Sequence, residues 1–128
     1  LFVANFIGES NTIGGTVAVS DDHKVQLEVI GSDHLLTGRG IKGSVNVGSE
    51  VYDVIKSQDI EIGDDVGGSN QFTCEIRQVS YQGDNSKVRV RTNEGLSIVA
   101  ITSKADTYAV GDQVSISWDA EDFLVFGN

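Results

Sequence analysis

Short segments in which polar and apolar residues alternate recur along this chain and restrict it to a β fold. In residues 24–30, Val25, Leu27 and Val29 fall on one face, as expected for a strand with one buried side. The same alternation appears in residues 87–91 and 113–118. Further candidate strands, bounded by residues that favour turns, are 16–20, 51–56, 60–62, 72–81, 96–102 and 123–126.

Turns in this chain depend on residues other than proline, because the sequence has 15 Gly and no Pro. Turn signals occur at Gly14-Gly15, Asp21-Asp22, 31–33, 83–85 and 93–95. Only residues 1–7 have a pattern that suits a short helical turn. So many short strands, closely spaced, predict a small barrel or a sandwich.

The chain also resembles itself at a constant spacing. Gly48-Ser-Glu-Val51 and Gly111-Asp-Gln-Val114 lie 63 positions apart, and the match continues without a gap from 58–62 onto 121–125. We therefore predict two pseudo-repeats, residues 13–63 and 71–128, joined by the acidic, glycine-rich loop 63–70.

Charge and cysteine content exclude several classes of protein. Nine Lys and Arg stand against 19 Asp and Glu, which gives a net charge of −10 and argues against a nucleic-acid partner. No apolar run approaches the roughly 18 residues that a membrane-spanning helix needs. The single cysteine, Cys74, excludes an internal disulfide framework and favours an intracellular compartment.

Motifs for nucleotide binding and nucleophilic catalysis are absent or lack their context. Gly38-Arg-Gly-Ile-Lys-Gly43 fits GxGxxG, but the following residues 44–47 read as extended, whereas a dinucleotide site needs a helix there. We interpret this segment as a flexible loop. The sequence contains neither a P-loop nor GxSxG.

Metal binding is equally weakly supported. A metal site could be imagined from Asp21, Asp22, His23 and Asp33. A simpler interpretation is that these Asp residues form turns and that the adjacent histidines, His23 and His34, lie on the surface. Asp64-Asp65 lacks the alternating ligands of a calcium loop. We expect no catalytic, cofactor-binding or metal-binding residue.

One strand carries a row of cations. Lys87, Arg89 and Arg91 project from one face, and Arg77 could join them from the preceding strand. Three like charges on one face favour either a ligand or partner patch, or a solvated face balanced by Glu75 or Glu94. The only tryptophan, Trp118, ends an alternating strand, and we expect it in the core.

Two segments resemble a known family. Phe2-Val-Ala-Asn-Phe-Ile-Gly-Glu-Ser-Asn11, followed by Gly15-Thr-Val17, resembles the start of the C-terminal region of ATP-binding subunits of ABC importers, in particular the spermidine/putrescine importers. The ending, residues 110–126, resembles that family's final strand pair, although Ala120 stands where the family has proline. The resemblance covers essentially the whole chain and implies a transport-associated OB-like (TOBE) barrel.

The resemblance sets the remaining expectations. The fold is all-β, an OB-like barrel built from two pseudo-repeats of short antiparallel strands. Residues 1–12 are an exit segment from an absent ATPase domain, and 13–128 are the regulatory domain. The fragment itself is no enzyme, because the Walker motifs, with ATP and Mg, belong to the missing part. The contacts with that part are expected at Phe2, Phe6, Ile7, Glu9 and Asn11.

The same resemblance implies partners and a location. A second copy of the subunit would form a homodimer, and the parent would bind membrane permease subunits at the cytoplasmic face of the membrane. The alternative is a small-ligand regulatory module of another importer class. That module would bind an oxyanion at Lys87, Arg89 and Arg91, or a polyamine at acidic loops such as 64–65 or 119–122.

Overall fold

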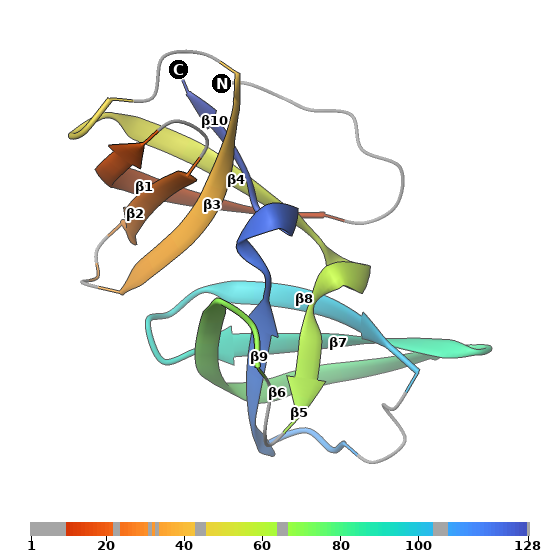
Figure 1. Ribbon diagram of the computed structural model, residues 1–128. Coiled ribbons are helices and arrows are strands. Elements are labelled where there is room, and N and C mark those ends of the chain that lie inside the picture. The colour runs from red at the N-terminus through yellow and green to blue at the C-terminus, as the bar shows by residue number, and fades with distance from the viewer. Residues whose placement is uncertain are drawn as a thin grey trace.

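The computed structural model describes residues 10–21, 24–30, 32, 34–42, 46–63, 67–103 and 108–127. Two β lobes lie one above the other and are joined by two short 3-10 turns (Figure 1). The elements are β1 (Ser10–Asp21), β2 (Lys24–Val29), β3 (Leu35–Lys42), β4 (Glu50–Lys56), η1 (Ser57–Asp59), β5 (Glu61–Gly63), β6 (Asn70–Gln82), β7 (Asn85–Thr92), β8 (Ser97–Thr102), β9 (Gln113–Trp118), η3 (Ala120–Asp122) and β10 (Leu124–Gly127).

Each lobe takes its fifth strand from the other half of the chain. The first lobe is a closed barrel with the strand order β1-β2-β3-β10-β4, and the second lobe is a sheet with the order β5-β9-β6-β7-β8. After β4 the chain passes through η1 and delivers β5 to the second lobe, whereas after β9 it passes through η3 and delivers β10 to the first (Figure 1). The two halves are therefore interlocked.

Strand register follows the alternation in the sequence. In β2, Val25, Leu27 and Val29 are buried, while the residues between them are half-buried or exposed. The predicted all-β, OB-like architecture is confirmed. One pairing departs from the expected antiparallel pattern, because β10 enters the first barrel from the other lobe and runs parallel to β3.

Two glycine-rich segments predicted as a turn and a loop are strands instead. Gly14-Gly15 lies inside β1, and Gly38 to Lys42 forms the second half of β3. A Cβ on Gly15 would lie 2.3 Å from Leu27 Cδ1, and one on Gly38 would lie 2.8 Å from the Phe123 carbonyl oxygen. These glycines permit the close approach of neighbouring strands, which sequence patterning reads as turn chemistry.

The core is continuous through both lobes. Leu27, Leu36 and Ile55 are fully buried in the first lobe, and Ile76 and Ile116 in the second. The predicted helical turn in residues 1–7 lies outside the described residues. Among the described residues no helix has the length and apolar character needed to cross a membrane.

The close packing of β10 against β3 can be tested by adding one methyl group. Gly38→Ala places a Cβ against Val125 and the Phe123 carbonyl, so we expect the free energy of unfolding to fall by about 1–3 kcal/mol. Gly67→Ala is the matched control, because nothing lies within 4 Å of the added atom. Urea denaturation of both variants measures the difference. Equal stability of the two variants would contradict the close packing of β10 on β3.

Candidate functional site

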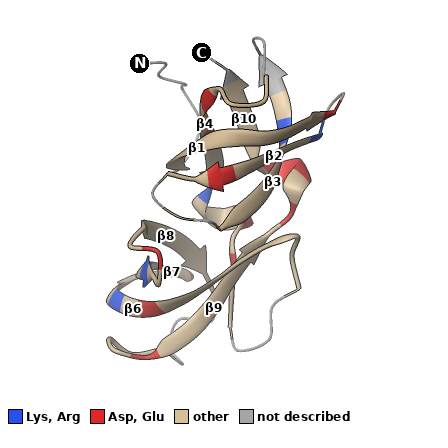
Figure 2. Cartoon of the chain, turned by 90° about the vertical axis from the view of Figure 1, so that its left-hand side faces the viewer, with Lys and Arg blue, Asp and Glu red and all other residues tan. Residues whose placement is uncertain are grey.

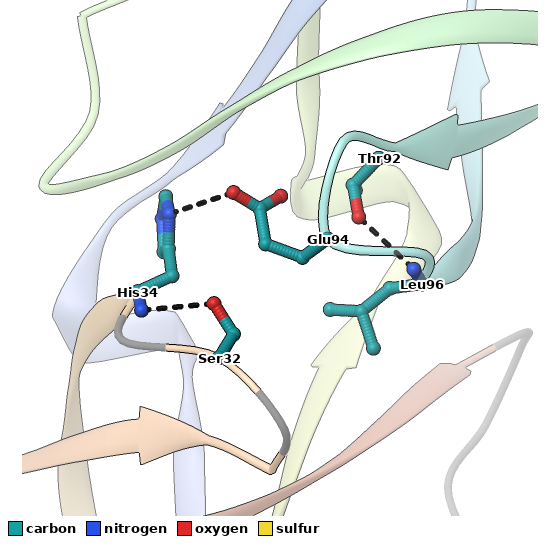
Figure 3. A network of polar contacts seen from close by, with 5 residues as sticks. All are labelled: Ser32, His34, Thr92, Glu94 and Leu96. Carbon is teal, nitrogen blue, oxygen red and sulfur yellow. Dashed lines mark hydrogen bonds and ion pairs between the residues drawn. The ribbon is translucent and has the colours of Figure 1, made fainter.

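Specific polar and aromatic contacts join the two lobes. His34, just before β3, reaches the second lobe, where its Nδ1 lies 3.2 Å from Glu94 Oε2 (Figure 3). Its ring stacks on Phe72 of β6, with centroids 4.2 Å apart. The side chains of His34 and Glu94 are only 27% and 21% exposed. The expectation of a surface turn histidine is therefore wrong, because tertiary contacts hold this ring between the lobes.

The turns on both sides of this contact are fixed by hydrogen bonds. The His34 N–H donates to Ser32 Oγ at 3.0 Å, and the Leu96 N–H donates to Thr92 Oγ1 at 3.0 Å (Figure 3). Gly95 has a φ of 94°, which is the left-handed conformation that this tight turn requires. The Glu94 carboxylate is thereby presented to the first lobe.

Two asparagines join the lobes reciprocally. The Asn11 side chain in β1 donates to the Val99 carbonyl at 2.9 Å and accepts from the Val99 N–H at 2.8 Å. The Asn70 side chain in β6 does the same for Thr37, at 2.8 Å and 2.7 Å. Each side-chain amide takes the place that the backbone of a neighbouring strand would have, so the N–H and carbonyl groups of Val99 in β8 and Thr37 in β3 are hydrogen-bonded.

An aromatic chain continues the junction inward. Phe72 lies 5.7 Å from Trp118, and Trp118 lies 5.4 Å from Phe123 in an edge-to-face arrangement, measured between ring centroids. All three side chains are buried. The prediction that Trp118 belongs to the core is confirmed.

A small pocket of about 180 Å³ opens beside the two 3-10 turns. Val54 and Leu124 contribute apolar surface. The charged residues that line it carry both signs: Arg39, Lys56, Asp59, Glu121 and Asp122. Asp59 and Asp122 are 63 positions apart, so they occupy equivalent places in the two halves.

The acidic residues of these turns influence one another. Burial raises the pKa of Asp122, and the carboxylates of Asp59, Asp119 and Glu121 raise it further. The Arg39 guanidinium opposes them and lowers it. Acidic residues gather at the turns between the lobes (Figure 2), and their mutual repulsion favours a cation or a proton there.

The predicted basic row lies on β7 of the second lobe (Figure 2). Arg89 and Arg91 are exposed and Lys87 is half-buried. Arg91 pairs across the strands with Glu75, which also forms an ion pair with Arg77 at 3.4 Å. Glu75 thus provides a negative charge at the Arg91 end of the row. That the row binds a ligand or a partner stays a prediction.

Other residues singled out from the sequence are placed only in part. Asn11, which lies in the first lobe, contacts Val99 in the second lobe of the same chain. The other residues expected to contact the ATPase domain lie outside the described residues: Phe2, Phe6, Ile7 and Glu9. The same is true of Asp22, His23, Asp33, Asp64 and Asp65. Within the described ranges, no group of three or more His, Cys, Asp or Glu side chains is arranged to hold a metal.

The one thiol is chemically quiet. Cys74 is buried in β6, with its Sγ 3.5 Å from the Val114 carbonyl oxygen. Burial and the nearby Glu94 carboxylate raise the pKa of this thiol to about 12, so the reactive thiolate is scarce at neutral pH. The asparagine and histidine contacts were not predicted from the sequence. Asn11 and Asn70 are polar residues at inward strand positions, which was the only signal for their contacts, whereas His34 lies in a loop before β3 and gave none.

The reciprocal asparagine contacts predict a stability effect. Asn11→Ala leaves the Val99 N–H and carbonyl without the amide, and Asn70→Ala does the same at Thr37, so each should cost about 2 kcal/mol of unfolding free energy. The controls are two exposed threonines: Thr12→Ala, next to Asn11, and Thr73→Ala, three residues after Asn70 in β6. Denaturant titration compares each pair. An Asn11→Ala protein as stable as Thr12→Ala would show that the contact does not hold the lobes together.

Comparison with known proteins identifies a family and several relatives. A family model described as the TOBE domain matches residues 54–126. A spermidine/putrescine import ATP-binding protein of Rubrobacter xylanophilus is 28% identical over 98% of this chain, and one of Thermobifida fusca is 32% identical over 94%. An Fe(3+) ions import ATP-binding protein of Rhizobium meliloti is 26% identical over 91%. The chain spans only about a third of the length of these relatives: 34%, 32% and 31%.

A solved structure shows the same fold. The cytoplasmic molybdate-binding protein ModG, crystallised with molybdate bound, superposes with a TM-score of 0.74 over 90% of this chain and 94% of its own, at 16% identity. The family match covers more than half of the chain and runs from the end of β4, through the second lobe, into β10. The chain belongs to the TOBE domain family, and the region it represents is non-catalytic.

Proposed function

We propose that this chain is the C-terminal regulatory and dimerisation domain of an ATP-binding subunit of an ABC importer for polyamines. The observation that carries the proposal is the alignment of nearly the whole chain with about a third of three spermidine/putrescine import ATP-binding proteins. ATP and Mg would then act in an ATPase domain outside this chain. Its permease partner and its place at the cytoplasmic face of the membrane would come with the parent subunit.

The architecture supports a mechanical role. A domain that keeps two ATPase domains together while they open and close must resist deformation, and the strand exchange and the two asparagine contacts tie the lobes to one another. A two-fold contact uses the same surface of both subunits and needs no catalytic group. Phe2, Phe6, Ile7 and Glu9 would connect this rigid body to the ATPase domain.

A second candidate is a regulatory module that binds a small ligand. The exposed guanidinium groups of Arg89 and Arg91 favour an oxyanion, and the acidic turns at Asp59 and Asp122 favour a polyamine. The two ligands have opposite charge, so they would bind different faces of the molecule. The transported substrate of the parent is a separate question, because relatives named for polyamines and for iron share this domain.

Molar mass in solution tests the dimerisation role. We expect light scattering across a concentration series to approach about twice the 13.7 kDa of the chain, because a dimerising domain carries its own self-complementary surface. A mass that stays at 13.7 kDa up to millimolar concentration would contradict a dimer made by this chain's own surface.

Calorimetric titration tests the ligand-binding alternative. If Arg89 and Arg91 bind an oxyanion, molybdate or phosphate should release heat that falls steeply with added salt and disappears in the Arg89→Gln/Arg91→Gln double variant. Lys24→Gln, which removes one exposed cation on the first lobe, is the charge-matched control for the single variant Arg89→Gln. The absence of heat with millimolar molybdate, phosphate and spermidine would exclude both forms of the alternative.

A further inference from the structure

Asp53, a buried acid in β4, breaks the internal repeat. In β4 the buried face should read as three apolar residues, but it reads Val51, Asp53 and Ile55. The position 63 residues later holds Ile116, which is fully buried in the second lobe. The first barrel therefore carries a carboxyl group at a place where its counterpart has a hydrocarbon side chain.

Among the described residues, the Asp53 carboxyl group has no hydrogen-bond partner on either oxygen. Its side chain is fully buried. On the strands beside β4, its paired neighbours are Ile13 of β1 and Val125 of β10. The buried faces of the facing strands β2 and β3 contribute residues such as Leu27 and Leu36.

No cation faces this group within the described part of the first lobe. The buried side chains of β1, β2, β3 and β10 are apolar, except for Asn11, whose amide is bound to Val99. Moving an isolated carboxylate into such surroundings is very costly, whereas the neutral acid is tolerated. Burial accordingly raises the pKa of Asp53 to about 8.

The strand beside Asp53 that is held least extensively is β10. It pairs with β4 only from Leu124 to Gly127, whereas β1 pairs with the other edge of β4 from Ser10 to Thr16. β10 also follows the short turn η3 directly. Its Val125 lies directly opposite Asp53 in the register, so removing β10 opens the barrel wall next to the carboxyl group.

We propose that protonated Asp53 acts as a latch for the exchanged strand: when the carboxyl O–H gives its proton to water, a local opening moves β10 out from between β3 and β4 and lets water reach the carboxylate. The second lobe stays folded in this opening. Because β10 also links the lobes, the latch makes their connection sensitive to pH.

The direction of the pH dependence follows from linkage. The closed barrel holds the Asp53 proton up to about pH 8, whereas the opened state loses it near the ordinary value of 3.8. The closed state therefore binds more protons throughout this interval, and its stability falls as pH rises from about 4 to 8. Above that range both states are ionised and the dependence ends.

Amide hydrogen exchange, followed by NMR, tests the latch on the intact chain. After correction for intrinsic rates, we expect the protection of Val125 and Phe126 to fall by up to about tenfold per pH unit between pH 5 and 8. Asp53→Asn should remove this slope. Ile116, in the second lobe, should keep its protection in both proteins.

A control variant and a second measurement separate the latch from other effects. Asp122→Asn removes a second carboxyl group with a raised pKa, close to β10 but exposed, and should leave the Val125 slope unchanged. If Asp53→Asn fails to fold, the Asp53 Cγ chemical shift of the wild-type chain reports the titration directly. A midpoint near pH 4 in the folded protein, an unchanged slope in Asp53→Asn, or an equal loss of protection at Ile116 would each overturn the proposal.

Discussion

The exchange of the fifth strands is the constraint on which the rest of this structure depends. β10 completes the first barrel and β5 extends the second sheet, so neither lobe has all of its strands without the other half of the chain. The chain must then cross between the lobes twice, at η1 and η3. The asparagine contacts, the His34–Glu94 pair and the acidic turns all lie where these crossings bring the lobes together.

Much of the fold can be predicted from residue patterns. Alternation identifies β2, β7 and β9, and the spacing of 63 residues identifies the two halves. The exchange itself cannot be predicted in this way, because β5 and β10 have the same buried pattern whichever lobe receives them. β3 is hidden for another reason: one of its glycines, Gly38, lets β10 approach closely, and glycine in an isolated sequence indicates a turn.

The junction is predicted less well than the strands. His34 and Asn70 read as ordinary loop and strand-end residues, and only their partners from distant segments give them a role. Asp53 is different, because an acid on the inward face of Val51-Tyr-Asp-Val-Ile55 is visible in the sequence, as is the isoleucine that replaces it in the repeat. A repeat thus provides its own reference for locating an exceptional residue.

Because the two lobes exchange strands, we expect them to fold and unfold as one unit. Scanning calorimetry at pH 5.5, where Asp53 keeps its proton, measures this directly through the ratio of calorimetric to van't Hoff enthalpy. The structure predicts a single transition with a ratio near one. Two resolved transitions, one for each lobe, would show that the lobes unfold independently and would contradict the claim.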